Sequence, residues 1–89
     1  MNLPQDDLRS ARFRKERETQ WRKLQALVTK AERQGVGKMT YTDARDLAEL
    51  YRQTTTSLAI AREISLDKAL LEYLEALTAR AYLAVYAPQ

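Results

Sequence analysis

The chain has 89 residues, the size of one small domain, and a formal net charge of +3 from 15 basic and 12 acidic side chains. It contains no cysteine and no histidine, which excludes disulfide bonds, thiol nucleophiles, zinc fingers and imidazole acid–base catalysis. With 45% hydrophobic residues but only two glycines and two prolines, the composition is typical of a helical domain, not of a disordered segment or a many-stranded sheet.

The first predicted helix covers residues 6–34. Pro4 and two aspartates suit a first helical turn, and Gly35 can close the helix in a left-handed conformation. Apolar residues recur at intervals of three and four, which places them on one face that packs against a partner helix. These residues are Trp21, Leu24, Leu27, Val28 and Ala31.

The second predicted helix covers residues 41–63. Thr40 and Asp43 resemble a capping box, in which the threonine hydroxyl accepts from a first-turn amide while the carboxylate reaches back. The β-branched run 54–56 is expected to weaken the helix. Apolar positions spaced by three and four predict antiparallel bundle packing. They are Ala44, Leu47, Tyr51, Thr54, Leu58 and Ala61.

The third predicted helix covers residues 66–86, with Ser65 as its N-cap. One broad apolar face is formed by Leu66, Leu70, Tyr73, Leu74, Leu77 and Ala81. Leu71, Leu83 and Val85 fall off that face. Because the helix is apolar over more than half its circumference, we expect it to need a partner beyond the other two helices.

Together these elements predict one all-α domain over residues 1–89, an up-down-up three-helix bundle joined by short connections. The first helix would be about 43 Å long and the others about 33 Å, so the first should overhang. Its basic end and the apolar end of the third helix should lie at opposite poles. The expected structural residues are Trp21, Leu24, Tyr51, Arg52, Leu58, Arg62, Tyr73, Leu77 and Arg80, with Tyr41 as a further core candidate.

The three structural arginines are expected to stack on aromatic rings or to pair with a carboxylate such as Glu49, Glu72 or Glu75. Pairs of acids three residues apart on a helix, without histidine, make a poor metal site. The segment Gly35-Val36-Gly37-Lys38 lacks the preceding strand and the following Ser/Thr of a phosphate loop. The sequence therefore offers no catalytic residue, metal site or cofactor site, and we expect no enzyme and no small-molecule substrate.

Positive charge is concentrated in residues 1–38, which carry ten basic and five acidic side chains. The longest uncharged stretches have nine residues, too few to span a bilayer, and no signal peptide is evident. A cytosolic location follows as an expectation. The basic stretch could bind phosphates of nucleic acid or, if the bundle lies flat, of anionic lipid. Glu16 and Glu18 interrupt it and no groove-reading motif follows, which favours a solvated or partner-contacting face.

Several motifs occur in a fixed order along the chain. They are Phe13, Arg17, Trp21 and Leu24, then Leu50-Tyr51-Arg52, then Leu58-Ala59-Ile60-Ala61-Arg62, then Tyr73-Leu74-Glu75-Ala76-Leu77, and finally Ala79-Arg80-Ala81 with Tyr86. In this order they resemble the N-terminal cytosolic region of the stage II sporulation protein M family. Two positions depart from that family, which usually has asparagine at Glu75 and often histidine at Tyr82.

The resemblance implies a cytosolic module on the cytoplasmic side of a bacterial membrane, preceding several transmembrane helices and linked to cell-envelope remodelling in spore formers. We therefore expect a non-enzymatic module that docks protein partners or that positions the transmembrane part. The uncovered leucines of the third helix predict, in addition, that the chain self-associates as a dimer or larger. The alternative is a module that binds nucleic acid through its first helix. The expected partner-binding residues are Arg9, Arg12, Arg14, Lys15, Arg17, Leu71, Leu83 and Val85.

Overall fold

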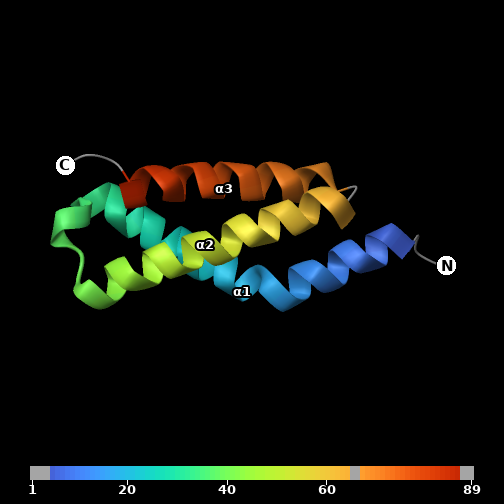
Figure 1. Ribbon diagram of the computed structural model, residues 1–89, viewed down its shortest axis with the longest axis horizontal. Helices are drawn as coiled ribbons and strands as arrows, with labels where there is room; N and C mark the ends of the chain where they lie inside the picture. Colours follow the sequence, from blue (N-terminus) through green and yellow to red (C-terminus); the bar gives the residue numbers. More distant parts are fainter. Residues whose placement is uncertain (1–4, 65–66, 87–89) are drawn as a thin grey trace.

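The computed structural model describes residues 5–64 and 67–86, which fold as a rod measuring 50 × 19 × 18 Å. Its elements are α1 (Gln5–Gln34), the 3-10 turn η1 (Val36–Lys38), α2 (Tyr41–Ile64) and α3 (Lys68–Tyr86). Figure 1 shows the three helices running in alternate directions, and each helix contacts both others. The predicted all-α, up-down-up bundle is therefore confirmed for the described residues.

The first helix ends at Gly35, as its sequence predicts. The amide of Gly35 donates to the carbonyl of Ala31 at 2.8 Å, and the backbone angles of Gly35 are φ 83° and ψ 144°. The positive φ is expected at this position, but ψ lies outside the left-handed helical region, in a region that essentially only glycine occupies. The chain therefore leaves α1 in an extended conformation before the turn of η1.

The N-terminus of α2 carries half of the predicted capping box. Thr40 Oγ1 accepts a hydrogen bond from the amide of Asp43 at 3.0 Å, as an N-cap should. The Asp43 carboxylate takes a different partner, because Lys30 Nζ of α1 donates to its Oδ2 at 2.6 Å. This ion pair ties the two helices together on either side of the connection.

The third helix begins at Lys68, two residues later than predicted. Asp67 is its N-cap, since Asp67 Oδ1 accepts a hydrogen bond from the amide of Leu70 at 3.1 Å. The predicted cap, Ser65, and the predicted first helical residue, Leu66, lie outside the described residues.

The core runs along the shared seam of the three helices. Trp21 is its central anchor: its side chain is 1% exposed, and its ring centroid lies 5.7 Å from that of Phe13 and 6.4 Å from that of Tyr73. Leu50 and Ser57 are also buried on α2, although the sequence pattern did not predict them. The buried apolar residues are Phe13, Trp21, Leu24, Leu27, Val28, Ala31, Leu47, Leu50, Leu58, Ala61, Leu70, Leu74, Leu77 and Ala81.

The long first helix extends beyond its neighbours, as predicted. It has 30 residues, against 24 in α2 and 19 in α3, and Figure 1 shows its first turns projecting past the adjacent end of the bundle. The start of α1 and the end of α3 lie at opposite ends of the rod. Among the described helices, none is both long and apolar enough to cross a membrane.

Candidate functional site

The three arginines expected to be structural have different surroundings. Arg80 of α3 binds Glu32 of α1 with two hydrogen bonds, Nε to Oε2 at 3.1 Å and Nη2 to Oε1 at 2.7 Å. Arg52 donates to Glu49 on its own helix, one of the predicted partners. Arg62 is exposed and makes no ion pair with the described residues. Arg52 and Arg80 thus each pair with a carboxylate, and the partner of Arg80 is an acid that was not among the candidates.

The Arg80–Glu32 pair changes the acidity of both groups. Hydrogen bonding from the Arg80 guanidinium holds the pKa of Glu32 below its usual range. The same hydrogen bonding raises the pKa of Arg80. Both side chains are partly exposed, so the pair is an ion pair at the edge of the core and not a buried one. We call this pair the clasp.

Two predicted core tyrosines lie at the surface. Tyr73 is 36% exposed, and its hydroxyl donates to Oε1 of Gln25 on α1 at 2.9 Å. Its ring still contacts Trp21, and partial burial is the main reason that the pKa of Tyr73 is raised. Tyr41 is 81% exposed, because it occupies the first position of α2, where the chain enters from the turn. The core assignment is wrong for Tyr41, and Tyr73 only borders the core.

Two of the basic residues expected to bind partners are engaged within the bundle. The Arg17 guanidinium lies 4.8 Å from the centre of the Phe13 ring, and Nη1 donates to Oγ of buried Ser57 on α2 at 3.1 Å. Arg14 pairs with Asp67, the N-cap of α3, at 3.5 Å. Arg17 therefore stabilises the contact of α1 with α2, and Arg14 links α1 to the start of α3.

The other three basic residues of this set face solvent. Arg9, Arg12 and Lys15 are exposed and make no ion pair with the described residues. Beside them, Leu8 is 50% exposed. A shallow hollow of about 420 Å³ lies between this end of α1 and the end of α2. It is lined by Leu8, Arg9, Arg12, Phe13, Glu16 and Ile64.

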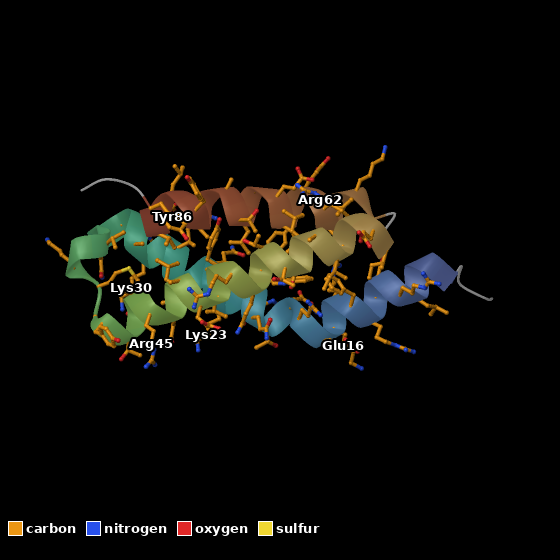
Figure 2. The ribbon with its side chains drawn as sticks, viewed as in Figure 1. Glu16, Lys23, Lys30, Arg45, Arg62 and Tyr86 are labelled. Atoms are coloured by element: carbon orange, nitrogen blue, oxygen red, sulfur yellow. The ribbon has the colours of Figure 1, made fainter. Side chains whose placement is uncertain are left out.

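A cluster of tyrosines bridges α2 and α3. The ring centroid of Tyr51 lies 6.4 Å from that of Tyr82 and 5.9 Å from that of Tyr86, and the latter two rings are 5.0 Å apart. Tyr82 is 52% exposed and Tyr86 59%. Together with Leu83, which is 63% exposed, these residues form what we call the tyrosine face. Figure 2 shows Tyr86 on α3, across the molecule from Lys23 and Glu16 of α1.

The leucines and the valine that were expected to contact a partner differ in their exposure to solvent. Leu83 is exposed, whereas Leu71 and Val85 are half-buried and pack against the core. The bundle itself therefore covers part of the surplus apolar surface of α3. What stays uncovered near the end of this helix is Leu83 with its tyrosine neighbours.

One signal in the sequence indicates part of the tyrosine face. Tyr82 and Tyr86 are four residues apart and so share one side of α3. The third member, Tyr51, was expected in the core, and its place at the edge depends on the antiparallel register of α2 and α3.

Among the described residues, no group of three or more acidic side chains is arranged to hold a metal ion.

Residues 11–87 match the model of one protein family, described as Domain of unknown function (DUF8413). The match covers most of the chain, which therefore belongs to this family. No curated protein and no solved structure shows significant similarity to the chain. The resemblance to the stage II sporulation protein M family stays a prediction.

Proposed function

We propose that this member of the DUF8413 family is a non-enzymatic docking module that pairs with a second copy of itself through the tyrosine face. The observation that carries the proposal is the exposure of Tyr82, Leu83 and Tyr86 side by side, each more than half open to solvent. Aromatic residues are enriched at the centres of protein interfaces, where they supply much of the binding energy.

The chemistry of this face suits a second copy of the same surface. A tyrosine hydroxyl both donates and accepts hydrogen bonds, so a two-fold axis through the face can satisfy the hydroxyls of both copies. Arg52, which follows Tyr51 in the chain, is neutralised by its ion pair with Glu49. The face therefore carries little net charge that would repel an identical partner.

Sedimentation equilibrium of the wild-type chain tests this proposal. We expect a mass of twice 10.3 kDa, falling to the mass of one chain in the double variant Tyr82→Ala, Tyr86→Ala. Each such anchor contributes roughly 2 kcal/mol, or about 30-fold in affinity, so removing two interface aromatics should weaken dimerisation at least about 900-fold. Because these side chains are exposed, the helical circular dichroism of the variant should match that of the wild type.

Tyr41→Ala is the matched control, because Tyr41 is a still more exposed tyrosine outside the tyrosine face. Its variant should remain dimeric, whereas Leu83→Ser should dissociate. A wild-type mass of one chain at high protein concentration would reject the proposal. So would equal weakening by Tyr41→Ala.

We also propose that the module belongs to a larger bacterial membrane protein, placed on the cytoplasmic side and positioning its transmembrane part. The support is the resemblance carried by the ordered motifs between Phe13 and Tyr86. The sequence encoded beyond Gln89 provides the test. Several apolar segments of about 20 residues are expected there, and a genomic reading frame that lacks them on both sides of this domain would contradict the proposal.

A further inference from the structure

The outward side of α1 carries cations along most of its length. Arg12, Lys15, Arg22 and Arg33 are exposed, and their spacing of three, seven and eleven residues keeps them on the side of the helix opposite the buried stripe. We call these four residues the basic ridge. From Arg12 to Arg33 the ridge extends about 31 Å at 1.5 Å per residue.

The charge of α1 exceeds that of the whole molecule. Residues 5–34, which form α1, hold nine basic and five acidic side chains, a net charge of +4, whereas the whole chain carries +3. Some of these cations are paired: Arg22 with Glu18, Lys23 with Asp46 and Lys30 with Asp43. Arg12, Lys15 and Arg33 make no ion pair with the described residues. The molecule therefore has one positive side, which a negatively charged surface would attract.

We propose that the basic ridge lies flat on a bilayer surface that contains anionic phospholipids. The ridge follows α1 along the rod, with the bend that Figure 1 shows in this helix, and its cations lie on one side, from which they can approach headgroup phosphates. Leu8 lies four residues before Arg12, on the same side of the helix, and half of its surface is exposed. An exposed leucine among cations is typical of a helix that inserts an apolar side chain between lipid headgroups.

The same features fit nucleic acid less well. A duplex offers phosphates but no apolar layer for Leu8, and the flank of the ridge carries the exposed carboxylate of Glu16. A helix that enters the major groove needs side chains able to read base edges. Arginine and threonine can read base edges, so the distinction rests on Leu8 and Glu16 and not on a lack of base-reading side chains.

Co-sedimentation with lipid vesicles tests the proposal. We expect the chain to bind vesicles of phosphatidylcholine with about one third phosphatidylglycerol, and not vesicles of phosphatidylcholine alone. The double variant Arg12→Gln, Lys15→Gln should lower the partition coefficient about 25-fold, because each cation near an anionic surface contributes roughly fivefold. Leu8→Ser should lower it several-fold.

The matched control is Arg45→Gln, Arg62→Gln, which removes the same net charge from exposed positions on α2, a different helix from the one that carries the ridge. Its partition coefficient should change less than about threefold. Equal loss in the two double variants would overturn the proposal, as would equal binding to both kinds of vesicle. Retardation of a DNA duplex in gels at moderate salt, with no binding to vesicles, would also overturn it and favour the nucleic-acid alternative.

The outcome is independent of the proposed self-association. The variants leave the tyrosine face intact, and their masses in sedimentation equilibrium should equal that of the wild type. A monomeric chain that still binds anionic vesicles would reject the dimer and retain the membrane contact. A dimer that binds no vesicles would reject the membrane contact and retain the dimer.

Discussion

Arg80 clasps Glu32 across two helices that are not consecutive in the chain. The residues are 48 positions apart, and two hydrogen bonds of 3.1 and 2.7 Å join the guanidinium to the carboxylate. Nη2 of Arg80 also lies 3.4 Å from Oγ1 of Thr29. Since no loop joins α1 directly to α3, this clasp is a specific polar link that holds the two parallel helices in register.

Glu32→Gln should change the response of stability to acid. The pKa of Glu32 is lowered by Arg80 in the folded protein, so its stabilising effect is complete above the unfolded-state pKa and is lost as the pH falls through the folded-state pKa. We expect the free energy of unfolding of the wild type to fall more steeply below about pH 4.5 than that of the variant. The difference should be at most about 1 kcal/mol, because the pair is exposed.

Urea denaturation between neutral and acidic pH measures this difference. Glu75→Gln is the matched control, because Glu75 is an exposed glutamate on α3 without an ion pair to the described residues. Its stability curve should run parallel to that of the wild type. If the Glu32→Gln curve is also parallel, the clasp does not contribute to stability.

Thr54→Val should stabilise the bundle. Thr54 is 1% exposed, and its hydroxyl has no hydrogen-bond partner among the described residues. A buried hydroxyl without a partner costs about 1 to 3 kcal/mol, and valine has nearly the same shape without this cost. We expect a rise in the free energy of unfolding of about 1 kcal/mol, measured by urea denaturation at neutral pH.

The neighbouring Thr55 provides the control for that prediction. Thr55 is exposed, and its hydroxyl donates to the carbonyl of Tyr51 at 2.9 Å. Thr55→Val removes this hydrogen bond at the surface. Since water already solvates the Thr55 hydroxyl, its removal relieves no burial cost, and the variant should gain no stability. Destabilisation by Thr54→Val would show that its hydroxyl has a partner, such as a buried water molecule.

Gly35→Ala should destabilise the protein although there is room for the new methyl group. A Cβ at this position would meet no atom within 4 Å, but φ is 83°, where other residues are strained by roughly 1 to 3 kcal/mol. Gly37→Ala is the control, because Gly37 is exposed and has no positive φ. Its thermal midpoint should stay near that of the wild type, and a comparable loss in both variants would contradict the role assigned to the Gly35 backbone.

The sequence pattern predicted the features that depend on one helix at a time. Trp21 and Leu24 are buried as the spacing of three and four indicated, and Gly35 ends the first helix. The overhang of α1 followed from helix length alone. These features could be predicted because the buried face of a helix and the residues that end it are local properties of the sequence.

The features that sequence reasoning missed depend on how the helices are placed against one another. The register of α1 against α3 determines which acid lies beside Arg80. The expected acids were Glu49, Glu72 and Glu75, and the sequence alone could not indicate Glu32. Ser57 is a buried polar residue of α2 whose hydroxyl accepts a hydrogen bond from Arg17 of another helix, a contact that the pattern of one helix does not predict. The tyrosine face required the register of α2 against α3, which places Tyr51 beside two tyrosines more than 30 residues away.

Because Trp21 is buried, its fluorescence reports on the folding of the protein. The chain has a single tryptophan, and its indole is nearly inaccessible to water and contacts Tyr73 of α3. Emission from this ring should therefore lie at short wavelength and resist quenching by iodide while α3 stays docked on α1. A shift to longer wavelength would signal that the third helix has separated, without any added dye.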